Sequence, residues 1–196
     1  MLNDRSTTLD LLLTRRSGKP RDMVAPGPDA NELATMLAAA SRVPDHGKIA
    51  PWRFVVIPAD AREAFADVLK AAMVAETPDA SARERADARE FALQAPTLVA
   101  VLSVPDRGHK IPVWEQELSA GVAAYNMELA AHAMGYVGGW LTGWAAYSPV
   151  VYEALGGEPG GRVASFLFFG TPSRALDERP RPALADVART WMPRLT

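Results

Sequence analysis

The sequence predicts a layered α+β or α/β domain built around one sheet. Short apolar runs with the composition of buried strands alternate with longer segments of helical periodicity, and this alternation favours a layered arrangement. The chain has 196 residues, enough for one domain with a substantial core. Hydrophobic residues make up 48% of it and charged residues 22%, which is typical of a globular protein.

The first half of the chain is expected to hold four helices and one strand. The helices cover about residues 7–14, 31–41, 61–75 and 82–93, and the strand covers 53–57. Two of these helices begin with capping-box spacing, Asp29 with Glu32 and Ser81 with Glu84. The fourth helix carries so many charged residues that we expect it at the surface.

The second half predicts three strands, one long helix and one short helix. The strands cover about residues 97–104, 136–142 and 162–170, and the long helix covers 112–134. Gly135 is a suitable C-terminal residue for the long helix, whose apolar faces predict burial on most sides. Ser148 and Pro149 can start the short helix, which Gly156 ends. We expect one domain over residues 1–196, with an extended tail from about residue 173.

Composition argues against several classes of function. A net charge of −2 gives no reason to expect a nucleic acid or an anionic membrane as the main partner. The chain has no Cys, which excludes disulfides, thiolate metal sites and a cysteine nucleophile. It also lacks a P-loop, a Gly-x-Ser-x-Gly turn and a His-Glu-x-x-His pattern, so we expect no metal site. A bound organic cofactor is then the simplest source of chemistry.

One segment raises the question of a membrane. Residues 129–152 contain no Asp, Glu, Lys or Arg and are long enough to span a bilayer. Four glycines and a proline interrupt the segment, so we interpret it as core or as subunit interface. The first residues do not resemble a signal peptide, and we expect a cytoplasmic protein.

Three short stretches could bind a ligand. Arg15-Arg16-Ser17 could bind phosphate oxygens, although alone it fits two cations at a helix C-terminus better. Arg42 and His46 flank a proline-stiffened loop between a helix and a strand, which suits either a ligand site or a helix cap. In the run from Gly138 to Trp144, glycines permit close approach of a flat ligand, although a tightly packed strand edge explains them equally.

Taken in order, these stretches resemble the FMN-dependent nitroreductase family, and within it the YdjA-like branch of NAD(P)H nitroreductases. The likeness extends to about Pro172. The matching pieces are Leu-Leu-Leu-Thr-Arg-Arg-Ser, Ala-Ser-Arg-Val-Pro-Asp-His, Pro-Trp-Arg-Phe, Pro-Val-Trp-Glu-Gln-Glu-Leu-Ser-Ala-Gly, Gly-Gly-Trp-Leu-Thr-Gly and Phe-Phe-Gly-Thr-Pro. The resemblance implies an α+β fold with a mostly antiparallel sheet flanked by helices, in an intertwined homodimer with FMN at the subunit interface.

The resemblance also implies roles for particular residues. The phosphate and ribityl end of FMN would be bound by Arg15, Arg16 and Ser17, and Arg42 and His46 would line the same site. The isoalloxazine would lie along Trp140, Leu141 and Thr142, supplied by the partner subunit. The long helix around Gly121 would form the dimer core. Lys48 and Arg16 are candidates for the cations near flavin N1.

Two features depart from the family pattern. The relatives carry a basic residue directly after the histidine that matches His46, whereas here Gly47 comes first and Lys48 second. The family also supplies a late basic residue to the phosphate, and Arg174, Arg179 and Arg181 remain equal candidates.

The activity implied is ping-pong reduction of a nitroaromatic or quinone-like small-molecule acceptor, with NADH or NADPH as donor. The chemistry would take place at flavin N5, so no side chain is assigned as catalytic. Two alternatives stay open, a flavin carrier or sensor without turnover, and another flavin chemistry such as flavin breakdown or dehalogenation on the same scaffold.

Overall fold

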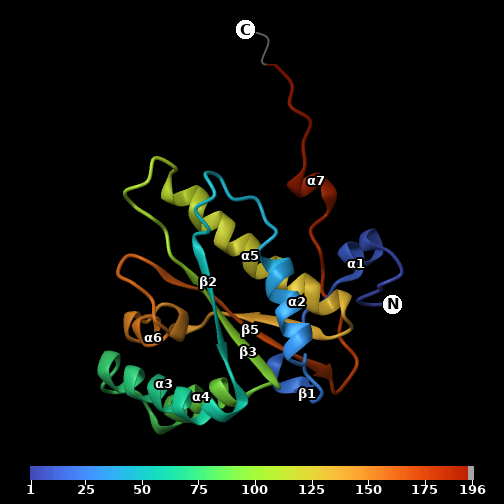
Figure 1. The fold of residues 1–196 in the computed structure, drawn as a ribbon. Coiled ribbons are helices and arrows are strands. Elements are labelled where there is room, and N and C mark those ends of the chain that lie inside the picture. The colour runs from blue at the N-terminus through green and yellow to red at the C-terminus, as the bar shows by residue number, and fades with distance from the viewer. Residues whose placement is uncertain (194–196) are drawn as a thin grey trace.

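The computed structural model describes residues 1–193, which form an α+β domain around one antiparallel sheet (Figure 1). The strands are β1 (Met23–Val24), β2 (Trp52–Ile57), β3 (Thr97–Ser103), β4 (Val137–Leu141) and β5 (Arg162–Pro172). The central strand β5 pairs with β3, β4 and the short β1, and β3 also pairs with β2. Every pairing is antiparallel, which confirms the sheet that the family resemblance implied.

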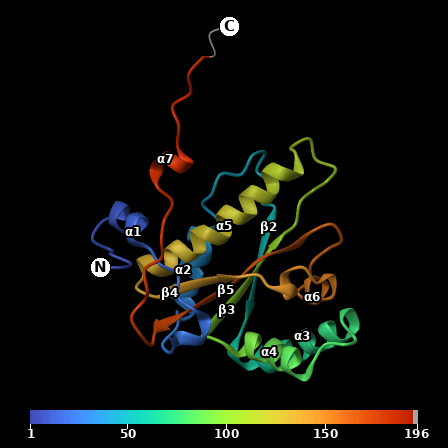
Figure 2. The same ribbon diagram turned by 180° about the vertical axis from the view of Figure 1, so that it is seen from behind.

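Helices cover both faces of the sheet (Figures 1 and 2). The helices are α1 (Thr8–Thr14), α2 (Ala30–Ala40), α3 (Arg62–Glu76), α4 (Ala82–Leu93), α5 (Val113–Ala133), α6 (Pro149–Ala154) and α7 (Leu184–Val187). One core lies between the sheet and α3, α4 and α6, and a second lies between the sheet and α2 and α5. Successive strand residues supply opposite cores, since Phe166 and Phe168 face α4 while Leu167 and Phe169 face α5.

The local signals in the sequence are confirmed at the helix ends. Both capping boxes form, at Asp29 and at Ser81, and Ser148 caps α6. Gly135 follows α5 with a φ of +96°, a conformation that favours glycine. The charged helix α4 lies at the surface, although Ala88 and Ala92 on its inner face are buried.

Several large apolar side chains remain exposed, against the expectation that α5 is buried on most sides. Trp114, Leu118 and Val122 are exposed at four-residue spacing along α5, so they form one stripe. On α1, Leu9 and Leu13 are also exposed. The C-terminal tail carries α7 away from the body of the domain (Figures 1 and 2), with Trp191 uncovered.

The charge-free segment of residues 129–152 does not form one continuous element. It comprises the end of α5, all of β4, the 3-10 helix η3 (Trp144–Ala146) and the start of α6. Within residues 1–193, no helix is both long enough and apolar enough to cross a membrane.

A buried arginine joins the ends of several elements. Arg62, at the start of α3, donates hydrogen bonds to the backbone carbonyls of Ile57, Ala92, Gln94 and Pro96. Burial lowers the pKa of Arg62 to about 10, and the guanidinium is still charged at neutral pH. This one side chain therefore satisfies carbonyls at the end of β2, the end of α4 and the start of β3.

We expect Arg62→Met to reduce the free energy of unfolding by about 3 kcal/mol, because it leaves several buried carbonyls without a donor. Urea unfolding followed by circular dichroism measures the change. The control is Arg83→Met, which removes an exposed ion pair with Asp87 and should cost less than about 1 kcal/mol. Equal losses in the two variants would contradict this role for Arg62.

Candidate functional site

The triplet Arg15-Arg16-Ser17 directly follows α1, and two of its side chains point inward to α5. Arg15 Nη2 donates to Ser17 Oγ at 2.6 Å, and Ser17 Oγ donates to Glu128 Oε1 at 2.6 Å. Arg15 also forms an ion pair with Glu128 at 3.6 Å, and its guanidinium lies 5.8 Å from the centre of the Tyr125 ring. The first and third residues of the triplet are thus fixed to the long helix.

Glu128 is a buried carboxylate, with only 4% of its side chain exposed. Burial raises the pKa of Glu128, but His132, the hydroxyl of Ser17 and the charge of Arg15 together outweigh burial and hold it below the usual 4.5. The imidazole of His132 is fully buried, with Nε2 3.6 Å from Glu128 Oε1. Neither ring nitrogen of His132 has a hydrogen-bond partner in the described chain.

Arg16 points the other way and lines a small cleft of about 40 Å³ with Ser17, Lys19 and Arg174. Its Nε donates to the carbonyl of Asp177 at 2.7 Å, which fixes the tail beside the triplet. The cleft wall also includes Asp22 and Asp177, and both carboxylates form ion pairs with Arg174. The cations left for a ligand in this cleft are therefore Arg16 and Lys19.

The structure separates the three late arginines. Arg181 Nη2 donates to the carbonyl of Arg15 at 3.2 Å, so its guanidinium lies directly beside the triplet. Arg174 is occupied by two carboxylates, and Arg179 forms no salt bridge within residues 1–193. Of the three, Arg181 lies beside the triplet, where it also pairs with Glu178 at 3.6 Å.

Strand β4 lies against the triplet within one chain. The Gly18 N–H donates to the Gly138 carbonyl at 2.9 Å. A Cβ on Gly139 would lie 2.8 Å from the Gly18 carbonyl oxygen, so only glycine permits this approach. Trp140, Leu141 and Thr142 follow at once, with Trp140 36% exposed. The start of this stretch therefore lies beside the triplet of the same chain.

Arg42 and His46 lie in a different place. His46 Nδ1 pairs with Glu115 Oε2 at 2.7 Å in the first turn of α5. Glu115 and Glu128 are thirteen residues apart on one helix, which is roughly 20 Å at 1.5 Å per residue. Arg42 and Lys48 are exposed, and neither side chain contacts the triplet in the part of the chain described. One chain therefore does not bring Arg42 and His46 to the triplet.

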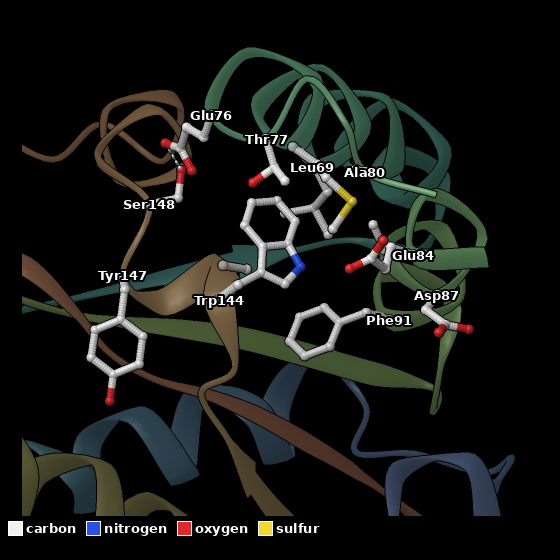
Figure 3. Close-up of a pocket in the computed structure, with 13 residues that line it drawn as sticks. Leu69, Glu76, Thr77, Ala80, Glu84, Asp87, Phe91, Trp144, Tyr147 and Ser148 are labelled. Atoms are coloured by element: carbon white, nitrogen blue, oxygen red, sulfur yellow. Dashed lines mark hydrogen bonds between the residues drawn. The ribbon is translucent and has the colours of Figure 1, made fainter. Parts of the chain in front are cut away.

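A cavity of about 570 Å³ lies between α3, α4 and the segment that follows β4 (Figure 3). Trp144 projects into its centre and Phe91 forms one wall. Its thirteen lining residues include the carboxylates of Glu76, Glu84 and Asp87 but no Lys or Arg, so it does not suit a phosphate group. None of the residues expected to bind FMN lines this cavity.

Sequence reasoning missed Glu128, His132 and Lys19. One signal for Glu128 was present, because it is the only charged residue between Leu118 and Ala133 on an otherwise apolar helix. A lone carboxylate in such a helix needs a buried partner. Its partner, however, is 111 positions away and could not be read from spacing.

Comparison with known proteins identifies the family. The model of the Nitroreductase family matches residues 13–171, most of the chain. The chain belongs to the nitroreductase family. A protein of Escherichia coli K12 with the provisional name NAD(P)H nitroreductase YdjA is 39% identical over 164 residues, which cover 84% of this chain and 87% of that protein. This agrees with the branch that the sequence motifs indicated.

Solved structures of other nitroreductases share the fold. A nitroreductase-like protein from Bacillus cereus superposes with a TM-score of 0.80 at 20% identity, covering 95% of this chain and 96% of that one. A nitroreductase with bound FMN from Bacteroides fragilis gives a TM-score of 0.69 at 21% identity, covering 94% and 98%. These likenesses confirm the predicted nitroreductase-like α+β fold.

Glu128 should make stability depend on acidity. The pKa of Glu128 is lower in the folded chain than its ordinary 4.5. The ionised carboxylate therefore stabilises the fold above pH 4.5, and this stabilisation is lost as the pH falls through the pKa of the folded chain. We expect Glu128→Gln to be less stable than the natural chain at pH 7, and this difference to shrink at pH 3.5. Urea unfolding at both pH values tests this, and a difference that does not change with pH would contradict it.

Proposed function

We propose that the chain is an FMN-dependent NAD(P)H oxidoreductase that reduces nitroaromatic or quinone-like acceptors by ping-pong two-electron transfer. Membership of the nitroreductase family carries this proposal. The name of the E. coli relative, an NAD(P)H nitroreductase, and the FMN bound to the B. fragilis structure support it. When bound, FMN supplies the redox chemistry, so the side chains are assigned binding and positioning roles only.

The phosphate end of FMN would be held beside the triplet. Arg16 and Arg181 offer guanidiniums there, and Lys19 adds a third cation at the same cleft. Arg15 and Ser17 complete the set, although both are engaged with Glu128. This cluster of cations fits a phosphate group, whereas the acidic cavity around Trp144 does not.

The ring system would extend from the phosphate along the end of β4. Trp140, Leu141 and Thr142 of the same chain lie in that direction, because Gly18 is hydrogen-bonded to Gly138. The exposed indole of Trp140 offers an apolar surface, and the backbone of the loop offers polar groups. These residues would orient the ring system and exclude water from one side of it.

Arg42 and His46 would come from a second copy of the chain. His46 lies roughly 20 Å from the triplet along α5, and Arg42 makes no contact with the triplet among the described residues, so neither has a role in a site built from one chain. In a homodimer they can approach the triplet of the partner, with His46 held in place by Glu115. Lys48, two residues further along the same loop, would then supply its charge across the interface.

Three features support the homodimer. The exposed stripe of Trp114, Leu118 and Val122 on α5 has no covering element among the described residues. A Cβ on Gly121, in the same helix, would meet no other atom within 4 Å, so no contact within the chain explains a glycine there. The tail extends away from the domain and carries exposed apolar side chains, as an intertwined dimer requires.

An absorption spectrum tests the proposed function. The purified protein with FMN should show the absorption of a bound flavin, and anaerobic NADH or NADPH should bleach it as the flavin is reduced. Adding a nitroaromatic or a quinone should restore the colour, and initial rates at several acceptor concentrations should give the parallel double-reciprocal lines of a ping-pong mechanism.

Two results would count against this function. If the protein bound no FMN after incubation, the chain would not be a flavoprotein. Protein that binds FMN but is bleached by neither nicotinamide would favour the flavin carrier or sensor. Product analysis after aerobic turnover separates acceptor reduction from flavin breakdown or dehalogenation.

The dimer is tested by Val122→Glu. This change places a charge in the apolar stripe of α5, so we expect a monomer in analytical ultracentrifugation and at least tenfold weaker FMN binding. Val74→Glu is the matched control, because Val74 on α3 is exposed to the same 43% as Val122 and lies on the opposite side of the sheet. A dimer that survives Val122→Glu would contradict the assigned interface.

A further inference from the structure

The side chain of Arg15 is engaged with Ser17 and Glu128. Its Nη2 contacts both Ser17 Oγ and Glu128 Oε1, and only 18% of the side chain is exposed. An arginine that binds a phosphate presents its guanidinium fork to the ligand. Here Nη2 faces the interior, against α5, while Nε is buried without a hydrogen-bond partner in the described chain, so a phosphate that took the fork through Nη2 would draw it away from a carboxylate.

Ser17 is occupied in the same way. Its hydroxyl proton is donated to Glu128, and its oxygen accepts from Arg15. A hydroxyl has one proton, so Ser17 cannot also donate to a phosphate oxygen without giving up Glu128. The carboxylate therefore competes with a phosphate for two of the three residues of the triplet.

Several groups surround the charge of Glu128. The groups that face it are Arg15 and Ser17 from the N-terminal segment, His132 on its own helix, and the backbone of β4, where a Cβ on Gly138 would lie 2.6 Å from Glu128 Cγ. Moving Arg15 to a phosphate takes the arginine charge away from Glu128 and places this buried anion beside a second anion. Loss of the pairing with Arg15 and repulsion between the two anions are both unfavourable at short range in a poorly hydrated site.

We propose that Glu128 restrains Arg15 and Ser17 from the flavin phosphate, so that this chain binds FMN weakly at its phosphate end and exchanges it readily. The inference rests on the proposed function and adds to it that FMN behaves as a dissociable ligand. It concerns the phosphate alone, because Glu128 contacts no residue assigned to the ring system.

The direct test is Glu128→Gln. Glutamine keeps the length of the side chain and an oxygen that accepts from Ser17, but it removes the negative charge. Dissociation constants for FMN and for riboflavin, which lacks the phosphate, are measured by flavin fluorescence with the full-length protein at pH 7.5. We expect FMN to bind about tenfold more tightly to the variant and riboflavin to bind unchanged.

The direction of the change separates this role from a structural one. A variant whose site was merely damaged would bind FMN and riboflavin more weakly, and that result would overturn the proposal, as would an unchanged FMN affinity. The matched control is Glu117→Gln, which removes a carboxylate from the same helix where it pairs with Arg162 and should change neither affinity.

A double-mutant cycle tests the route through Arg15. If Glu128 acts by restraining that guanidinium, most of the gain from Glu128→Gln should vanish when Arg15 is replaced by Met. A gain that persists in full would overturn the restraint of Arg15.

The natural chain provides a measurement that needs no variant. We expect FMN to bind it no more than about tenfold more tightly than riboflavin, because its phosphate has to displace Glu128. A preference of a thousandfold would overturn the proposal. If the natural chain bound neither flavin, the proposed function would fail as well. Binding of both flavins with a strong preference for FMN would overturn only the restraint by Glu128.

Discussion

The network that joins Arg15 and Ser17 to Glu128 fixes the part of the chain on which the site depends. It ties the segment after α1 to the longest helix, and α5 is in turn packed on the sheet. With that segment fixed, Gly18 can pair with Gly138 at the edge of β4. Glu128 cannot be left alone in this position, because an unpaired buried carboxylate destabilises the fold strongly. The conformation of the triplet is thus determined by the stability of the fold as well as by any ligand.

Much of the fold could be predicted because its signals are local. The capping boxes at Asp29 and Ser81 are formed by residues three positions apart, and strand burial follows a run of neighbouring apolar residues. The two-residue strand β1 was missed because it has no periodicity of its own. It exists only because Met23 and Val24 meet the end of β5, far away in sequence.

Motifs could nominate candidate residues for the site, but they could not predict how those residues are arranged. The ordered motifs pointed to the triplet, the Arg42–His46 loop and the stretch after Gly139, which no single motif could do. Spacing could not show which of them lie in one chain. That depended on the Gly18–Gly138 hydrogen bond and on the length of α5 between Glu115 and Glu128. Nor could it show that Arg15 faces inward, since its partner lies on a helix more than a hundred residues away.

The proposed division of the site between two copies would link flavin binding to assembly. A ligand that contacts both subunits stabilises the dimer by its differential affinity for dimer over monomer, and the dimer raises flavin affinity to the same extent. The apolar stripe on α5 and the carboxylate of Glu128 then act in opposite directions on the formation of the flavin-bound dimer. The stripe favours assembly without flavin, whereas Glu128 opposes the phosphate that would complete it. A chain with both features can remain a dimer while its flavin leaves, because the apolar stripe and Glu128 are different residues of the same helix.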